Sequence, residues 1–333
     1  MSEPLLELRG VAKRFVKPLD TAARIAGVLG MAPREEIVHA VDGVDVAVAK
    51  GEVVGLVGES GCGKSTLGRI AVGLLEPSAG TRHWHGSDVA TMAPAVRQRV
   101  HLAIQMIFQD PYAALNPRMR LQQIIGEAPV VHGLVAKSQQ KDYVAELMGR
   151  VGLDAGLMGG FPHQFSGGQR ARIGIARALA VRPEFLVCDE ALAALDVSIQ
   201  AQVLNLFIGL RADLALTYLF ISHDLSVVRH VSDRVLVMYL GRVVESAPTE
   251  ELYATPNHPY TQALLAGIPR LEPGRRTYIP IKGEVPSPIN PPSGCHFHPR
   301  CPHAMPRCLT EQPALKEIAP GRLSACHLND VKS

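Results

Sequence analysis

The sequence predicts an α/β protein whose sheet is mostly parallel, and two observations lead to this fold class. The apolar run 53–57 is typical of a buried strand, and it is followed by a glycine-rich turn and a helix pattern from Lys64 to about Leu75. Two further apolar strands, 185–188 and 217–221, are each followed by helix-like sequence. Because strands that alternate with helices usually pair in parallel, these segments are expected to form one mostly parallel sheet.

The composition is that of an ordinary globular protein. Of 333 residues, 47% are hydrophobic and 20% are charged, which provides for a core. A net charge of +3 is too small to indicate a nucleic-acid surface. No apolar run approaches the roughly 18 to 20 residues that span a bilayer, and the N-terminus lacks a signal-peptide pattern. We therefore expect a cytosolic chain that reaches the membrane through partners, with its six cysteines outside any disulfide framework.

The elements before the parallel core are less regular. Residues 5–9 and 41–48 look like strands, and valines alternate with polar or small residues in the second. The stretch 16–38 between them contains prolines and glycines. We interpret it as a surface insertion that holds one short helix around residues 21–29.

A helical subdomain is predicted over residues 110–165, where helix formers are frequent and long segments such as 137–151 occur. This segment lies between strands of the α/β core, so it is expected to be an insertion into that core. Further on, residues 234–245 indicate a closing hairpin that turns at Gly241.

The tail differs in composition from the rest of the chain. From about Thr255 prolines become frequent, and four of the six cysteines lie after residue 290. The tail is therefore predicted to be a separate, irregular module. The predicted domains are residues 1–254 and residues 255–333.

The glycine-rich turn fits the nucleotide-binding pattern G-x-x-x-x-G-K-[ST] between a strand and a helix. Backbone N–H groups at the helix start can cradle phosphates, Lys64 can reach the β and γ oxygens, and Ser65 can ligate Mg²⁺. A chance match is expected in on the order of 1% of chains of this length, and the strand and helix around the motif lower that figure. The predicted nucleotide-binding residues are Gly58, Glu59, Ser60, Gly61, Cys62, Gly63, Lys64, Ser65 and Thr66.

A second motif opens a predicted helix that continues to about Ala180. The hydroxyl of Ser166 and the bare backbone donors of two glycines make an anion site there. The alternative is an ordinary N-cap with flexible glycines. The motif resembles the LSGGQ signature of ABC ATPases, with Phe at a packing position in place of the usual Leu. It consists of Phe165, Ser166, Gly167, Gly168 and Gln169.

Two carboxylates follow the strand pattern 185–188. At the carboxyl end of that strand, beside the glycine-rich turn, Asp189 can hold Mg²⁺ through water, and Glu190 can polarise the attacking water as a general base. A solvated turn is the common alternative for such a pair. Its position about twenty residues after the signature motif favours the catalytic interpretation.

Four further positions resemble ABC ATPase motifs. Gln109 matches the Q-loop glutamine, which senses Mg²⁺ and contacts transmembrane subunits, and residues 193–196, ending in Asp196, resemble the D-loop. His223 stands in the place of the switch histidine, although a lone histidine is more often structural. Phe15 lies where the family has an aromatic residue that stacks on adenine, and core packing is an equally weighted alternative. The resemblance implies a P-loop ABC ATPase core, with a mostly parallel sheet and an antiparallel β subdomain.

The chain departs from the family pattern E-P-T-S-A-L-D at two positions. Ala191 replaces Pro and Ala193 replaces Ser, whereas Glu190 and Asp196 are retained. Ala193 removes a hydroxyl at the seam where two ATPase domains meet in this family, so communication between two sites could differ.

Three segments resemble the ATPases of dipeptide and oligopeptide permeases. They are residues 108–118, residues 258–265 and the stretch from Pro286 through Cys295 with the cysteines beyond it. The resemblance implies hydrolysis of MgATP on the cytoplasmic face of the membrane. It also implies a second, related ATPase subunit, two transmembrane permease subunits and an extracytoplasmic solute-binding protein, with no nucleic-acid partner.

Other functions remain open at this stage. Relatives of this family also move nickel or other small solutes. A soluble ABC protein that acts on ribosomes or DNA is a further alternative, although the chain has one set of motifs and no sustained heptads. A regulatory subunit without turnover is opposed by Glu190 and His223.

The four tail cysteines have the spacing C-x5-C-x6-C-x17-C, and in the cytosol such a cluster suggests a metal. Spacing alone leaves iron, zinc or free thiols open, and His296, His298, His303 and His327 could serve zinc. The resemblance to the peptide-permease ATPases implies a [4Fe–4S] cluster with a structural role. Cys62 and Cys188 lie inside nucleotide-binding motifs and are not expected to be ligands. The expected ligands are Cys295, Cys301, Cys308 and Cys326.

Overall fold

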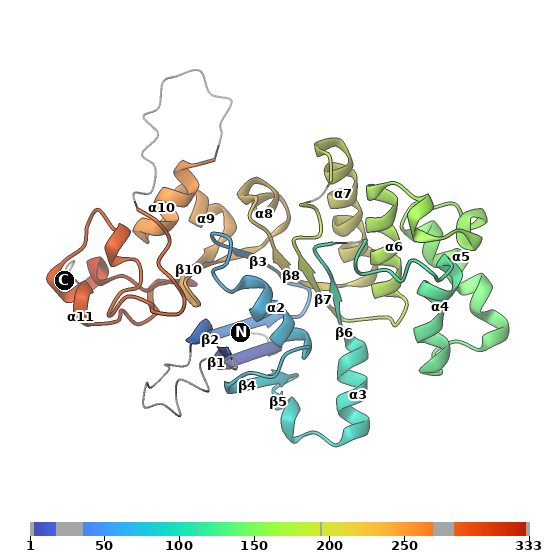
Figure 1. Cartoon of the computed structure of the whole chain (residues 1–333), viewed down its shortest axis with the longest axis horizontal. Helices are drawn as coiled ribbons and strands as arrows, with labels where there is room; N and C mark the ends of the chain where they lie inside the picture. The colour runs from blue at the N-terminus through green and yellow to red at the C-terminus, as the bar shows by residue number, and fades with distance from the viewer. Residues whose placement is uncertain (1–2, 18–35, 111, 194, 269–282, 331–333) are drawn as a thin grey trace, which may run out of the picture.

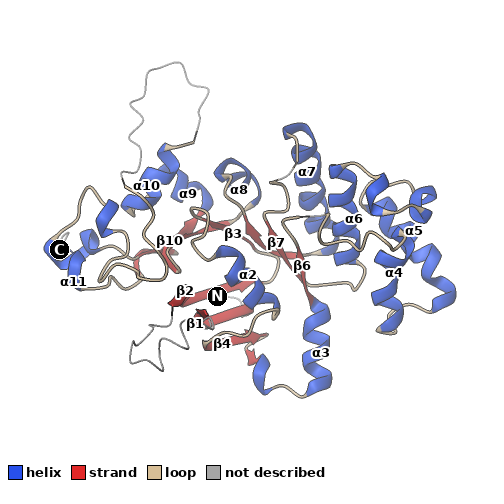
Figure 2. Cartoon of the chain, viewed as in Figure 1, coloured by secondary structure: helices blue, strands red, loops and turns tan. Residues whose placement is uncertain are grey.

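Two β-sheets make up the body of the chain in this computed structural model, which describes residues 3–17, 36–110, 112–193, 195–268 and 283–330. In these ranges the larger sheet has eight strands in the order β11-β12-β10-β9-β3-β8-β7-β6, and the smaller has the order β2-β1-β4-β5. Figure 2 shows the helices arranged around them. No helix in these ranges combines the length and apolarity needed to cross a membrane.

The centre of the larger sheet is parallel, as the sequence predicts. β3 (Val53–Val57) pairs in parallel with β8 (Thr217–Ile221) on one side and with β9 (Arg234–Tyr239) on the other. β7 (Phe185–Asp189) and β6 (Ile104–Ile107) continue the parallel order. β3, β7 and β8 are buried along their whole length, which explains their continuous apolar runs.

The smaller sheet is antiparallel. β1 (Pro4–Lys17) pairs with β2 (Glu36–Ala49), and β1 also pairs with β4 (Ala79–Trp84), beside which lies β5 (Ser87–Asp88). The predicted strands are therefore present but longer than expected. Residues 16–17 pair with residues 36–37, so the predicted insertion was drawn too wide, and the expected helix at 21–29 lies outside the described residues.

Helix α2 lies between the two sheets. Its buried residues Leu67 and Ile70 share a core cluster with Leu6 of β1 and Leu56 of β3. This contact places the glycine-rich turn at the junction of both sheets. The α-helices of the core are α2 (Lys64–Val72), α3 (Pro94–Ala103), α6 (Gly167–Leu179), α7 (Val197–Leu214) and α8 (Leu225–Val231).

The predicted helical segment forms one end of the molecule, opposite to the tail (Figure 1). It contains α4 (Leu121–Val131) and α5 (Gln140–Arg150), which pack against α6. The helix expected over 137–151 begins as a 3₁₀ turn and becomes an α-helix at Gln140. The short 3₁₀ helices of the chain are η1 (Val89–Thr91), η2 (Lys137–Gln139), η3 (Ala155–Gly159), η4 (Pro162–Gln164), η5 (His298–Arg300) and η6 (His327–Asp330).

The tail packs on the core rather than standing apart from it. β10 (Arg242–Pro248) forms the expected hairpin with β9 through Gly241, whose φ is 80°. β12 (Arg322–Ser324) then pairs with β10 and so extends the larger sheet. The division at residue 254 stays a prediction. The helix α9 (Thr249–Ala254) follows β10, and the other elements of the tail are α10 (Pro259–Ala266), α11 (Pro306–Thr310) and β11 (Lys316–Ala319).

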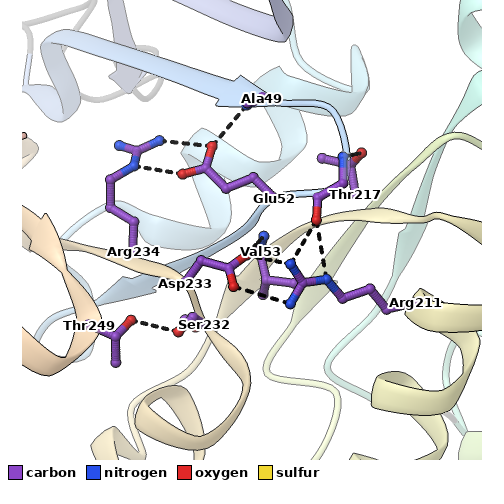
Figure 3. Close-up of polar contacts among 10 residues, drawn as sticks. Ala49, Glu52, Val53, Arg211, Thr217, Ser232, Asp233, Arg234 and Thr249 are labelled. Atoms are coloured by element: carbon purple, nitrogen blue, oxygen red, sulfur yellow. Dashed lines mark hydrogen bonds and ion pairs between the residues drawn. The ribbon is translucent and has the colours of Figure 1, made fainter. Parts of the chain in front are cut away.

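Ion pairs hold the edge of the sheet at which β3 and β9 begin. Arg234 Nε donates to Glu52 Oε1 at 2.8 Å, and Arg211 of α7 bonds Asp233 at 2.6 Å (Figure 3). Asp233 also accepts the N–H of Val53 at 2.8 Å. These contacts fix the starts of the two neighbouring strands β3 and β9. A ligand site in a parallel sheet lies at the opposite edge, where the strands end.

Candidate functional site

The glycine-rich turn connects β3 to α2 and can be built only with glycine at two positions. Gly58 has φ 153° and Gly63 has φ 105°. A Cβ atom at Gly58 would overlap the carbonyl oxygen of Met238, and one at Gly63 would overlap that of Ala40. The turn is therefore packed tightly between β9 and β2, which holds its backbone in place.

Lys64 is buried and its ammonium group lies over the turn. Its Nζ donates to the carbonyl oxygen of Gly58 at 2.8 Å and to that of Glu59 at 3.0 Å. A positive charge above a loop that opens a helix forms an anion-binding site.

Ser65 and Asp189 lie side by side at the carboxyl edge of the sheet. The hydroxyl of Ser65 donates to Asp189 Oδ1 at 2.8 Å. Burial raises the pKa of the Asp189 carboxyl, and the hydrogen bond from Ser65 opposes that rise. A hydroxyl and a carboxylate in contact are oxygen ligands of the kind that Mg²⁺ takes beside phosphates, so these two residues fit such an ion.

Glu190 is the meeting point of three loops. Gln109 Nε2, after β6, donates to Glu190 Oε2 at 2.8 Å. His223 Nδ1, after β8, lies 3.4 Å from the same oxygen. The backbone of Glu190 has φ 46°, and its N–H donates to the carbonyl of Ile221 at 3.0 Å. A non-glycine residue in this strained conformation, held by its neighbours, is typical of an active site.

The signature motif caps α6. Ser166 Oγ accepts from the N–H of Gln169 at 3.3 Å, and Gln169 Oε1 accepts from the N–H of Ser166 at 3.0 Å. Phe165 is buried, as expected for a packing position, and a Cβ atom at Gly168 would overlap Ile199 of α7. Within the described ranges no hydrogen bond joins Ser166 or Gln169 to residues 58–66. The described part of a single chain therefore does not join the two motifs by these hydrogen bonds.

The residues predicted to form the D-loop begin three positions after Glu190. The N–H of Ala193 donates to the carbonyl of Glu190 at 3.0 Å, while Ala194 lies outside the described residues. Asp196 is exposed at the N-cap of α7, and the next residue, Val197, is 83% exposed.

Phe15 lies on β1 with 40% of its surface exposed, so core packing is the wrong interpretation of this residue. The Nζ of Lys13 lies 5.5 Å from the centroid of its ring. The contact of this ring with adenine stays a prediction.

Two residues that touch the turn were not singled out from the sequence. Tyr260 accepts the backbone N–H of Glu59 at 2.8 Å, and Arg300 Nη1 donates to the Glu59 carboxylate at 2.6 Å. Tyr260 lies in the segment 258–265 that resembles the permease ATPases, but no local pattern links either residue to the turn, because 201 and 241 positions separate them from Glu59.

Among the described residues, the four tail cysteines are not arranged as a metal site. Burial, with the charges of Cys301, Cys295 and Cys308 as smaller contributions, raises the pKa of the Cys326 thiol to about 11. In the part of the chain that the structure describes, no group of three or more His, Cys, Asp or Glu side chains is placed to hold a metal ion. The geometry therefore does not support the expected [4Fe–4S] cluster.

The fold and the site together define the ATPase of an ATP-binding cassette. A family model described as "ABC transporter" matches residues 41–193, and one described as "Oligopeptide/dipeptide transporter, C-terminal region" matches residues 244–308. The ATP-binding cassette MJ0796, solved as a dimer bound to ADP and Pi, superposes with a TM-score of 0.61 at 24% identity over 73% of this chain and 98% of its own. CbiO1 of Clostridium perfringens gives a TM-score of 0.61 at 24% identity over 76% of this chain and 92% of its own.

Similar sequences are more specific. The oligopeptide transport ATP-binding protein AppF of Bacillus subtilis is 50% identical over 98% of both chains. A putative oligopeptide transport ATP-binding protein of the same organism, YkfD, is 51% identical over 89% of this chain and 92% of its own. A putative peptide import ATP-binding protein of Brucella ovis is 47% identical over 98% of this chain and 99% of its own. The chain belongs to the family of ATP-binding proteins of ABC peptide transporters.

Proposed function

We propose that this chain hydrolyses MgATP at a site completed by a second ATPase subunit and thereby powers uptake of di- or oligopeptides through separate transmembrane subunits. The observation that carries the ATPase part is the convergence of Gln109, Glu190 and His223 next to the Ser65–Asp189 pair. Their loops come from neighbouring parallel strands, so the packing of the sheet sets their spacing.

Each residue has a role that follows from its chemistry. Lys64 and the backbone of residues 58–66 bind the phosphates, and Ser65 and Asp189 would hold Mg²⁺, which neutralises charge on the transferred phosphoryl group. Glu190 accepts the proton of the attacking water as a general base. Its contacts with Gln109 and His223 orient the carboxylate.

The remaining residues would act across a subunit interface. Ser166 and Gly168 lie at a helix N-terminus, which suits the γ-phosphate bound to the opposite subunit. The exposure of Asp196 and Val197 supports a contact surface at this point. Because each half-site coordinates the triphosphate only in part, the isolated chain should hydrolyse ATP slowly.

Peptide transport rests on the relatives and on the match of the tail to the peptide-transporter region. The proposal includes a distinct second ATPase, two permease subunits and an extracytoplasmic solute-binding protein, with this chain docked on the cytoplasmic face. Nickel or another small solute is the alternative cargo.

The test of the transported substrate is uptake into vesicles that contain the assembled transporter. MgATP-dependent accumulation of labelled peptides supports the proposal, and accumulation of Ni²⁺ without peptides supports the alternative.

A second proposal is a metal module in the tail, and it rests on the number of cysteines there and on the resemblance to the peptide-permease ATPases, not on the described geometry. Four thiols gathered in one short segment suit iron or zinc, and such a module would stabilise a tail with little core of its own. The described geometry would have to adjust, because no three ligands already converge. No step of ATP hydrolysis depends on this module.

Metal analysis of protein purified without oxygen tests the module. A brown protein with absorption near ~400 nm and about four irons per chain supports the [4Fe–4S] cluster. Colourless protein with one zinc per chain supports zinc, and metal-free protein would leave the cysteines as structural thiols.

A further inference from the structure

Two residues of the tail form hydrogen bonds with Glu59, the one acidic residue of the nucleotide-binding turn. Glu59 is the only acidic residue among positions 58–66. Its carboxylate accepts from Arg300 Nη1 at 2.6 Å and from Nη2 at 2.9 Å, a bidentate pair. Its backbone N–H donates to the hydroxyl of Tyr260 at 2.8 Å. Side chain and backbone of Glu59 are thus both bound by residues from beyond position 255.

Arg300 is buried and its orientation is fixed. Its side chain is 5% exposed, whereas that of Glu59 is 24% exposed. The hydrogen bonds that Arg300 donates to Glu59 raise the pKa of the Arg300 guanidinium, so it stays charged. The guanidinium carbon lies 5.8 Å from the ring centroid of Tyr239, and Nη1 lies 3.4 Å from the hydroxyl of that residue. A planar guanidinium held in this way already points two N–H donors at the carboxylate, so little further side-chain entropy is lost when the pair forms.

An aromatic cluster supports the pair. Phe297, one turn before Arg300, is 2% exposed and packs edge-on against Tyr239 at 5.3 Å between ring centroids. It also lies 5.4 Å from the ring of Tyr260, which is itself 4.7 Å from Tyr239. The rings come from β9, from α10 and from the segment before η5. Therefore the position of Arg300 depends on the fold of the tail.

The pair lies where a negative charge would oppose ATP binding. The carbonyl of Glu59 accepts from Lys64 Nζ at 3.0 Å, so this residue lies beside the lysine that is proposed to bind the phosphates. An unpaired carboxylate there would repel the triphosphate, and partial burial would strengthen the repulsion. The guanidinium of Arg300, a residue of the tail, neutralises that charge.

We propose that Arg300 is a positioning residue of the ATP site, which neutralises Glu59 and holds the nucleotide-binding turn in the conformation that receives the triphosphate. This inference rests on the ATP site proposed above. It assigns the tail a part in nucleotide binding that is separate from any metal at its cysteines.

The experiment compares two arginine variants of the full-length chain. Arg300→Gln is expected to raise the Kd for MgATP, measured by calorimetry, on the order of tenfold. The KM for ATP rises in parallel and kcat changes little, because the lost interaction acts on binding rather than on the chemical step. The matched control is Arg307→Gln, since Arg307 lies in the same tail and makes exposed pairs with Glu311 at 2.6 Å and Asp330 at 2.9 Å. This control should bind ATP as the parent does.

A double variant separates charge from packing. Glu59→Gln combined with Arg300→Gln removes the unpaired carboxylate and should recover most of the lost affinity, and Arg300→Lys, which keeps the charge, should be intermediate. An unchanged Kd in Arg300→Gln would overturn the proposal. A double variant as weak as Arg300→Gln alone would also overturn it, because the loss would then come from tail packing. If Arg300→Gln does not fold, the comparison of Arg300→Lys with Arg307→Lys decides in the same way.

Lys64→Ala distinguishes this proposal from the site on which it rests. Retained ATP binding in Lys64→Ala would mean that the ATP site itself is wrongly assigned. Loss of binding in Lys64→Ala together with parental binding in Arg300→Gln would overturn only the role of Arg300.

Discussion

Glu190 occupies a conformation that its own residue type disfavours, and the structure supplies the contacts that keep it there. Its φ of 46° is held by the hydrogen bond of its N–H to Ile221, while Gln109 and His223 contact its side chain. A side chain fixed in this way loses little conformational entropy when water and the phosphate bind beside it. Such a fixed carboxylate suits a general base.

We expect Glu190→Gln to bind MgATP as the parent does and to hydrolyse it ~10² to 10⁴ times more slowly, because the amide cannot accept the proton. The assay combines equilibrium ATP binding with phosphate release. Glu184→Gln is a suitable control, since this glutamate precedes the same strand and is 46% exposed. Turnover like that of the parent in Glu190→Gln would show that another group is the base.

At the scale of elements, α10 carries a buried histidine as its N-cap. His258 Nδ1 accepts from the N–H of Tyr260 at 3.1 Å, and the N–H of His258 donates to Glu245 on β10 at 2.8 Å. Burial lowers the pKa of the His258 imidazole to about 4. The helix α10, whose Tyr260 contacts the nucleotide-binding turn, is thus capped by the neutral imidazole of His258. A protonated Nδ1 could not accept the N–H of Tyr260.

The stability of the chain should therefore fall in acid. The unfolded histidine has a pKa of about 6.5, so between about pH 6.5 and pH 4 the unfolded state binds a proton that the folded state does not. Above pH 6.5 both states are neutral and this contribution is constant. The free energy of unfolding should decline by up to about 1.4 kcal/mol per pH unit from this residue across that window. Denaturant titrations at several pH values measure the slope, and His258→Asn, which keeps a capping side chain, should make it shallower. An identical slope in both proteins would contradict the assignment.

The loop after β6 is the second element with an expected function. Tyr112 is 53% exposed, and the guanidinium of Arg170 lies 5.0 Å from its ring centroid. We expect the helical segment to dock a cytoplasmic helix of a permease subunit through residues 112–118. Tyr112→Ala should leave ATP binding unchanged and lower peptide uptake or co-purification with the permease. Leu157→Ala, on η3 of the same segment and 39% exposed, serves as a comparison. Full uptake by Tyr112→Ala would remove this loop from the coupling path.

At the scale of the whole molecule, the tail shares both the sheet and the core of the ATPase. β12 pairs with β10, and Phe297 belongs to the same buried cluster as Val57 of β3. Tyr260 is fully buried in that cluster. These contacts argue that residues 255–333 contribute to the stability of the preceding part.

Truncation tests this dependence. A chain that ends at residue 254 should unfold at a melting temperature lower by more than about 5 °C and should bind ATP more weakly. It lacks β12, which pairs with β10, and it lacks the rings of Tyr260 and Phe297 that cover Tyr239. Calorimetric scans of both chains provide the measurement, with and without MgATP. Equal melting temperatures would instead support two independent domains that meet at residue 254.

The sequence by itself determined what is encoded in short windows of the chain. The nucleotide-binding turn between β3 and α2, the cap of α6 by Ser166 and the apolar strand that ends in Asp189 were all predicted, because glycine placement, capping chemistry and hydrophobic runs act over a few residues. Only the tertiary structure decided which distant residues meet. Gln109, Glu190 and His223 converge because β6, β7 and β8 are neighbours in one sheet, and strand order is set by packing over the whole core. The same long-range packing brings Arg300 to Glu59, 241 positions away, and pairs β12 of the tail with β10. Short sequence patterns do not encode such contacts.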